Sequence, residues 1–200
     1  MASTDYVKIP RQRVGVLIGF EGKTRRTIED LTQTNLNIDS EDGTVTISPQ
    51  ENMEDPLGVW KTNYIVKAIG RGFSPEMAIE LNKDDIYLEV MKLTDYVGKS
   101  KKALERYKGR IIGRDGKTRE LIIKMAEVSV AVFGKTVSII GTIENVLIAK
   151  EAIEMIINGS RHKSVYGFLE HKHQEKKVKE FRKVVGLEND EKIEFRDDNI

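Results

Sequence analysis

A twelve-residue stretch occurs twice in this chain of 200 residues. LIGFEGKTRRTI spans Leu17 to Ile28, IIGRDGKTRELI spans Ile111 to Ile122, and seven of the twelve positions are identical. The same offset of 94 positions (17 against 111) also pairs Gly15 with Gly109. A repeat of this period predicts two similar domains rather than one large one. Each copy keeps a Gly-x-x-Gly sequence followed by lysine and arginine.

Composition limits the classes of protein that such a chain can belong to. Hydrophobic residues make up 39% and charged residues 32%, which is typical of a globular protein with a charged surface, and the net charge of +1 means that any basic surface is local. The absence of cysteine excludes disulfides and thiolate metal sites. The first 25 residues lack the apolar run of a secretory signal, and no run reaches the ~18 residues of a membrane span. We therefore expect a cytoplasmic protein without membrane attachment.

Hydrophobic periodicity predicts the same order of elements in both halves. In the first half we expect a strand at 6–9, two helices flanking the turn at Gly19 to Gly22, a hairpin of 36–38 with 44–47, a helix at 57–69 and a short helix capped by Ser74. In the second half we expect a strand at 86–93, helices at 99–112 and directly after Gly116, strands at 128–133 and 136–140, and a helix at 143–157.

Each half therefore follows the order β-α-turn-α-β-β-α. The predicted fold class is α+β, with two tandem domains that each pack helices on one face of a three-stranded antiparallel sheet. We place the first domain at 1–82 and the second, with a C-terminal helix, at 83–185. The charged segment 186–200 is expected to be a disordered tail.

A nucleotide-binding P-loop is the first alternative for the repeated turn, because Gly-Lys-Thr ends the sequence G-x-x-x-x-G-K-[ST]. The first glycine of that motif would stand at position 17 or 111, where the chain has Leu17 and Ile111. The turn also joins two helices instead of a strand and a helix. The spacing excludes the P-loop.

Cations gather around both turns. From Lys99 to Lys124 ten lysines and arginines face three acids, and from Lys8 to Arg26 six face one. A charge run is usually only a solvated surface, and glycines by themselves permit a tight turn, but two local excesses at the same turn favour phosphate contact. Glycine lets a ribose-phosphate backbone approach closely, and the start of the following helix attracts phosphate.

At these residues the chain resembles the KH family of RNA-binding domains, whose GXXG loop holds about four nucleotides of single strand. The element order resembles type I. Many KH domains have an aliphatic residue three positions after the second glycine, where this chain has Arg25 and Arg119. The resemblance predicts RNA contacts in both copies: Lys108, Gly109, Arg110, Ile112, Gly113, Arg114, Asp115, Gly116, Lys117 and Arg119 in the second, and Gly19, Phe20, Gly22, Lys23 and Arg25 in the first.

Three segments carry a narrower resemblance. GRGFSPEMAIELN (70–82), GRIIGRDGKTRELI (109–122) and NGSRHKSVYGFLE (158–170) are similar to the archaeal branch of the partner-of-Nob-one family of ribosome-assembly factors. This resemblance implies binding to single-stranded RNA near the 3′ end of the small-subunit ribosomal RNA precursor, work alongside a Nob-one-like endonuclease, and no catalytic activity of its own. The alternatives are a KH protein of transcription or RNA decay and a protein-interaction scaffold.

Metal or acid–base chemistry has weaker support. His162, His171 and His173 share one lysine-rich stretch without a neighbouring acidic cluster, and no pair of carboxylates has the spacing or apolar context of an acid–base couple. We therefore predict no enzyme activity, no metal and no cofactor.

The two copies differ in charge. The middle of the second turn is Arg114-Asp115 and that of the first is Phe20-Glu21, so we expect the second copy to bind phosphate more strongly. Between Arg26 and Lys61 the chain has eight acids and no cation: Glu29, Asp30, Asp39, Glu41, Asp42, Glu51, Glu54 and Asp55. Such a surface is either solubilising or a docking face for a basic protein partner.

Overall fold

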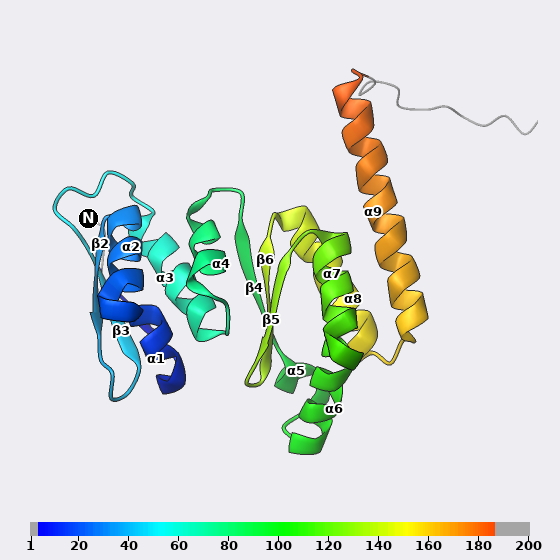
Figure 1. The fold of residues 1–200 in the computed structure, drawn as a ribbon, viewed down its shortest axis with the longest axis horizontal. Coiled ribbons are helices and arrows are strands. Elements are labelled where there is room, and N and C mark those ends of the chain that lie inside the picture. The colour runs from blue at the N-terminus through cyan, green and yellow to red at the C-terminus, as the bar shows by residue number, and fades with distance from the viewer. Residues whose placement is uncertain (1–3, 187–200) are drawn as a thin grey trace, which may run out of the picture.

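The computed structural model describes residues 4–186 and contains two units of the same build (Figure 1). The first unit has one sheet, with the strand order β1-β3-β2, and all neighbouring strands are antiparallel. Its elements are β1 (Asp5–Lys8), α1 (Arg11–Ile18), the 3₁₀ turn η1 (Phe20–Gly22), α2 (Lys23–Thr32), β2 (Thr34–Ile38), β3 (Thr44–Pro49), α3 (Gly58–Gly70), α4 (Pro75–Ile79) and the 3₁₀ turn η2 (Glu80–Asn82).

The second unit repeats this arrangement with the strand order β4-β6-β5, again antiparallel. Its elements are β4 (Tyr87–Lys92), α5 (Leu93–Val97), α6 (Lys101–Ile112), the 3₁₀ turn η3 (Arg114–Gly116), α7 (Lys117–Ala126), β5 (Ser129–Phe133), β6 (Thr136–Gly141), α8 (Ile143–Ile157) and α9 (His162–Val184). The predicted α+β fold of two three-stranded sheets with helices is confirmed.

Matching apolar positions of the two copies form two cores. Leu17 and Ile28 flank the first turn and are fully buried, as are Ile111 and Ile122 at the second. Both pairs pack against the sheet of their own unit, with Ile47 in the first core and Ile139 in the second. The two helices of each turn are thereby held over the sheet, and the turn itself is left at the surface.

Helices of the first unit cover the second face of the second sheet. β6 is buried at every position, and its side chains alternate between the two faces of the sheet. Val137 and Ile139 belong to the second core, whereas Ile140 joins Ala131 of β5 in the first core beside Phe73. Figure 1 accordingly has α3 and α4 between the two sheets. The two units therefore share one apolar interface.

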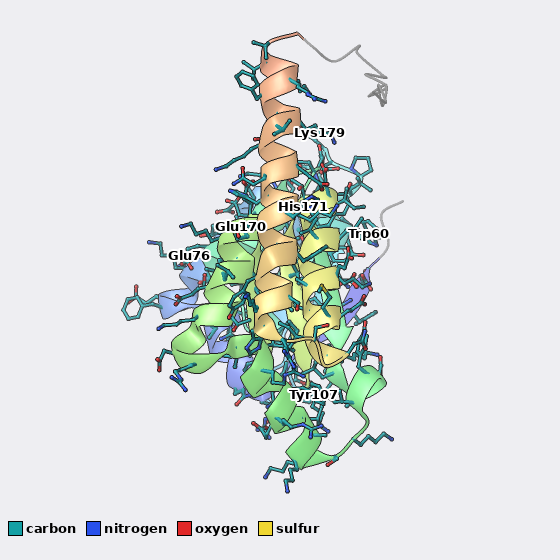
Figure 2. All side chains as sticks on the ribbon, turned by 90° about the vertical axis from the view of Figure 1, so that its right-hand side faces the viewer. Trp60, Glu76, Tyr107, Glu170, His171 and Lys179 are labelled. Carbon is teal, nitrogen blue, oxygen red and sulfur yellow. The ribbon has the colours of Figure 1, made fainter. Side chains whose placement is uncertain are left out.

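The structure differs from the sequence expectation in one element. The strand expected over 86–93 spans Tyr87–Lys92, and α5 follows it directly with the buried Leu93 as its first residue. α9 runs past the second unit, with Lys179 on its projecting part (Figure 2). In the tail expected at 186–200, residues 187–200 lie outside the described part of the chain, and the division at 82 and 83 stays a prediction. Within residues 4–186 no helix is both long and apolar enough to span a membrane.

Candidate nucleic-acid interface

Both repeated turns have the same unusual backbone. In the second, Gly113 has φ 75°, Asp115 φ 54° and Gly116 φ 79°, and in the first Glu21 has φ 48°. A Cβ added at Gly113 would lie 2.2 Å from Thr118 Oγ1, because the turn folds tightly against the start of α7. Glycine is required there both for its dihedral angles and for this close approach.

Side chains around the second turn leave its outer surface open. Arg114, Asp115 and Lys117 are exposed, and α7 begins at Lys117 without a capping side chain among the described residues. The first N–H groups of a helix have no partner within the helix, and they form its partly positive end. The turn therefore combines two exposed cations with a helix start that can bind an anion.

Two of the predicted contacts on α6 already have partners inside the second unit. Lys108 Nζ pairs with Glu105 Oε1 at 2.7 Å, and Arg110 Nη2 donates to the carbonyl oxygen of Ser160 at 2.7 Å. Gly109 is exposed on α6, one turn before Gly113. Lys108 and Arg110 are thus committed to contacts inside the second unit, although the sequence groups them with the basic turn.

A groove of about 340 Å³ runs beside this turn along the outer edge of β5. On one side it is lined by Arg119 and Ile123 of α7, and Figure 1 shows β5 between α7 and α4. Arg119 Nε is buried and has no hydrogen-bond partner among residues 4–186. The half-buried Ile112 ends α6 next to the turn. The groove is therefore mostly apolar, with one unpaired cationic donor in its wall.

The corresponding place in the first unit has the opposite chemistry. Glu29 occupies the position of Ile123, and its Oε1 accepts from Leu36 N of β2 at 2.7 Å and from Arg25 Nε at 3.0 Å. This one carboxylate therefore accepts hydrogen bonds from both the arginine and the edge of the strand. Phe20 at the tip of the first turn is 84% exposed, and Lys23 is exposed beside it.

Glu29 and Ile123 are the site residues that sequence reasoning missed. The signal was present, because the offset of 94 that aligns the two turns also aligns these two positions. Their importance depends on β2 and β5, the edge strands that they face, and this arrangement became visible only in the folded chain.

The eight acids of the first unit do not form one face. Asp39, Glu41 and Asp42 lie in the β2–β3 turn, and Glu51, Glu54 and Asp55 follow β3 at its other end. Several are already paired. Lys8 Nζ lies 3.0 Å from Asp42 Oδ2, and Lys61 Nζ lies 2.9 Å from Asp55 Oδ2.

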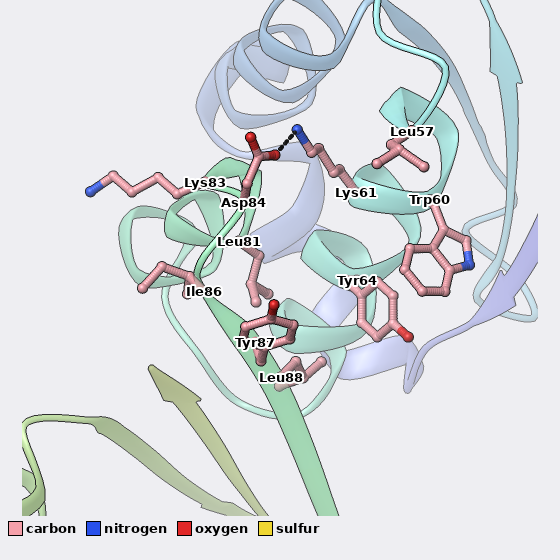
Figure 3. Close-up of a pocket in the computed structure, with 10 residues that line it drawn as sticks. All are labelled: Leu57, Trp60, Lys61, Tyr64, Leu81, Lys83, Asp84, Ile86, Tyr87 and Leu88. Atoms are coloured by element: carbon pink, nitrogen blue, oxygen red, sulfur yellow. Dashed lines mark ion pairs between the residues drawn. The ribbon is translucent and has the colours of Figure 1, made fainter. Parts of the chain in front are cut away.

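A second hollow, of about 290 Å³, lies where α3 meets the start of β4 (Figure 3). Trp60 and Tyr64 of α3 border it together with Tyr87 and Leu88 of β4. Trp60 is 59% exposed and packs edge-on against Tyr64 at 5.0 Å between ring centroids. Lys61 lies at its rim and contacts Asp84 at 2.8 Å. This hollow combines exposed aromatic surface with carboxylates nearby.

Two of the three histidines of α9 contact backbone carbonyl groups of the second unit. His162 Nε2 lies 3.0 Å from the carbonyl oxygen of Arg110, and His173 Nδ1 lies 3.1 Å from that of Met125. His171 is on the exposed side of the helix, beside Glu175. No group of three or more potential metal ligands occurs within the described range.

The fold and the two Gly-x-x-Gly turns define a tandem KH-domain protein of type I. The general KH-domain model matches residues 4–55, and the model of the eukaryotic-type (type I) KH domain in its PNO1 second-domain form matches residues 87–174. The chain is 47% identical over 180 residues to a KH domain-containing protein of Methanocaldococcus jannaschii, which covers 90% of this chain and 78% of that protein. The chain belongs to the archaeal PNO1/Dim2p family of KH-domain proteins.

Two further relatives have more specific descriptions. A chain from the crystal structure of an a/eIF2alpha–aDim2p–rRNA complex of Pyrococcus horikoshii superposes with a TM-score of 0.82 at 50% identity, covering 86% of this chain and 95% of that one. The pre-rRNA-processing protein PNO1 of Coccidioides immitis is 34% identical over 138 residues, which is 68% of this chain and 53% of that protein. The chain thus spans about half the length of this fungal relative.

Proposed function

We propose that this protein binds single-stranded RNA through its second KH domain and acts in assembly of the small ribosomal subunit, near the 3′ end of the small-subunit rRNA precursor. The observation that carries the RNA-binding part is the groove along β5, where an apolar lining adjoins an open helix start and the unpaired Arg119. Relatives described as rRNA-bound Dim2p and as a pre-rRNA-processing protein support the assignment to ribosomal RNA.

Each part of the site has a distinct role in this proposal. The glycines Gly113 and Gly116 let the sugar-phosphate backbone approach the turn, and Arg114, Lys117 and the start of α7 neutralise its phosphates. Ile112 and Ile123 receive unstacked bases, whose edges face β5 and Arg119. Lys108 and Arg110, already paired inside the domain, supply local positive charge and no direct phosphate contact. No step of this role requires catalysis by the chain.

The first domain contributes less to RNA binding in this proposal. Its turn keeps Gly19 and Gly22, with Phe20, Lys23 and Arg25 as possible contacts, but Glu29 places a carboxylate where RNA bases would pack. This carboxylate repels phosphate, and it already accepts the hydrogen bond of the Leu36 N–H at the edge of β2. Its Gly-x-x-Gly turn therefore touches RNA only weakly.

Protein docking is the role for which the first domain has the better surface. The hollow with Trp60 and Tyr64 exposes aromatic side chains of the kind enriched in protein interfaces. Asp84 lines this hollow and, with Asp55, pairs with Lys61 at its rim, so a partner with a basic surface would find two carboxylates there. A Nob-one-like endonuclease, implied by family resemblance, and an aIF2α-like factor, from the description of the Pyrococcus complex, are the candidates.

A pair of matched variants tests the RNA assignment. Arg114→Asp turns the second loop into Gly-Asp-Asp-Gly, and Phe20→Asp makes the equivalent change in the first. Fluorescence anisotropy with a labelled single-stranded RNA covering the 3′ end of the rRNA precursor is expected to show at least a tenfold loss for Arg114→Asp, because about 1.4 kcal/mol of phosphate contact is lost. Phe20→Asp is expected to lose less than threefold.

The same assay distinguishes the competing functions. A duplex of the same sequence is expected to bind much more weakly, because the groove accepts only unstacked bases. Equal losses in the two variants would refute the dominance of the second domain. Wild-type protein without measurable RNA affinity would leave the protein-scaffold function instead.

A further inference from the structure

The groove beside the second turn has two walls, and only one of them belongs to the second domain. Arg119 and Ile123 form the wall on α7, while Gly72, Phe73, Ser74 and Met77 of the first domain form the wall opposite. We propose that the segment Gly72–Met77 of the first domain contacts one RNA base held in the second domain's groove and, with Arg119, sets the preference for that base. This inference rests on the proposed RNA-binding function.

Strand alternation explains how two domains come to border one groove. Val130 and Val132 of β5 face α7 and the second core, whereas Ala131 faces the first core and Phe133 contacts the segment at Gly72. The outer edge of β5 therefore runs between the two walls. A base laid along this edge meets α7 on one side and the first domain on the other.

The wall from the first domain is fixed in position. Arg13 Nε donates to the carbonyl oxygen of Ile69 at 2.7 Å, and Arg13 Nη2 donates to that of Phe73. The same guanidinium lies 5.8 Å from the centre of the Phe133 ring. A Cβ at Gly72 would lie 2.8 Å from the Cβ of Phe133, so the segment and the strand are in close contact. The wall is thus anchored to β5 as well as to its own domain.

The arginine in the opposite wall indicates which kind of base fits. The Arg119 side chain lines the groove, and a guanidinium only donates hydrogen bonds, so a base that presents acceptors to this wall fits better than one that presents donors. Arginine pairs best with the O6 and N7 acceptors of guanine. Met77, 48% exposed at the groove, can pack its flexible thioether against the ring. We therefore expect guanine to be preferred at this one position.

A selection experiment with the whole chain tests this role. A pool of single-stranded RNA decamers randomised at every position is bound to the wild type, to Met77→Glu and to Leu57→Glu, and the bound RNA is sequenced. Wild type is expected to enrich guanine at one position by about fivefold or more. Met77→Glu places a carboxylate in the groove with Arg119, so enrichment at that position is expected to fall below about twofold. Leu57→Glu introduces the same carboxylate at an exposed residue directly before α3, outside this groove, and is expected to behave as wild type.

A milder variant and a second measurement separate the possible failures. Met77→Ala removes only the side chain's contact with the base and is expected to weaken the guanine preference without changing the thermal transition, since Met77 is half exposed. If Met77→Glu keeps the wild-type preference while Arg114→Asp abolishes binding, the first-domain wall has no such role and the proposed function stands. If the wild type enriches no RNA from the pool, the proposed function fails and this inference fails with it.

Discussion

Gly113 is held by two independent constraints. Its backbone, at φ 75° and ψ 175°, lies in a region that is essentially restricted to glycine, and a side chain would collide with Thr118. Gly109, four residues earlier, has neither constraint. It lies in α6, and an added Cβ would have no described neighbour within 4 Å. The same residue type therefore has a structural requirement at one position and none at the other.

Alanine at these two positions is expected to have opposite effects on the free energy of unfolding. Gly113→Ala should cost about 1–3 kcal/mol, because the backbone is strained and Thr118 must move. Gly109→Ala should gain about 0.5–1 kcal/mol, because alanine is the better helix former. Urea unfolding followed by circular dichroism measures both. A stable Gly113→Ala variant would contradict the tight turn described here.

Some residues of the site could be predicted from the sequence and others could not. The glycines and the exposed cations Arg114 and Lys117 were predictable, because both stand in the repeated sequence itself. The contacts made by the side chains of Lys108 and Arg110 were not predictable, because the folded helices bring their partners Glu105 and Ser160 to them. A local count of charge does not distinguish free cations from paired ones.

At the scale of the single element, the β2–β3 hairpin is stabilised by one carboxylate. Asp42 accepts from Thr44 N and Thr44 Oγ1, both at 2.8 Å, and from Lys8 Nζ at 3.0 Å, which connects the turn to β1. These hydrogen bonds, first from the Thr44 side chain and then from Lys8, lower the pKa of Asp42 to about 2. The folded state thus favours the ionised carboxylate.

This lowered pKa predicts a pH dependence of the thermal transition. A carboxyl with a pKa lower in the folded state than in the unfolded state contributes stability above its unfolded pKa, near 3.8, and that contribution is lost as the pH falls through about 2. Asp42→Asn is expected to lower Tm at pH 6 and to lose less between pH 4 and pH 2 than wild type. Glu41→Gln, the same change one residue earlier, is the control. Parallel pH curves for wild type and Asp42→Asn would refute this role.

Most elements follow from their own sequence, and the exceptions have physical causes. Ser74 caps α4 as predicted, with its Oγ accepting from Met77 N at 3.4 Å. The order of strands and helices follows from hydrophobic periodicity in both copies. α5 was missed because the buried Leu93 continues the alternation of β4, so the side-chain pattern does not show that the backbone has turned into a helix.

At the scale of the whole molecule, the two domains depend on one apolar interface. Ala131 and Ile140 of the second sheet are buried against the first domain, and Leu88 packs partly against the same cluster. This interface was not predicted. In the structure, β6 is buried at every position, so neither of its faces meets solvent. The sequence does not reveal this, because Thr136 and Ser138 are polar and look like residues of a solvent-facing side.

Removal of the first domain is therefore expected to destabilise the second. A fragment of residues 83–186 should unfold at lower urea concentration than the whole chain, because the face with Ala131 and Ile140 becomes exposed to water. Ile140→Thr is the matched variant, and it should destabilise the whole chain but not the fragment. Equal stability of fragment and whole chain would show that the interface contributes little.

The left-handed residues Glu21 and Asp115 have a kinetic consequence. The fold itself holds both turns in this conformation, because Gly19 and Gly113 pack against Thr24 and Thr118, so the conformational entropy of the turns is lost when the chain folds and not when it binds. The ordering cost of complex formation then falls on the RNA, whose bases must leave their stacks. Under the proposed function, we therefore expect the rate of association to depend on how often a target strand is unpaired, and a strand sequestered in a hairpin to be captured only as fast as that hairpin opens.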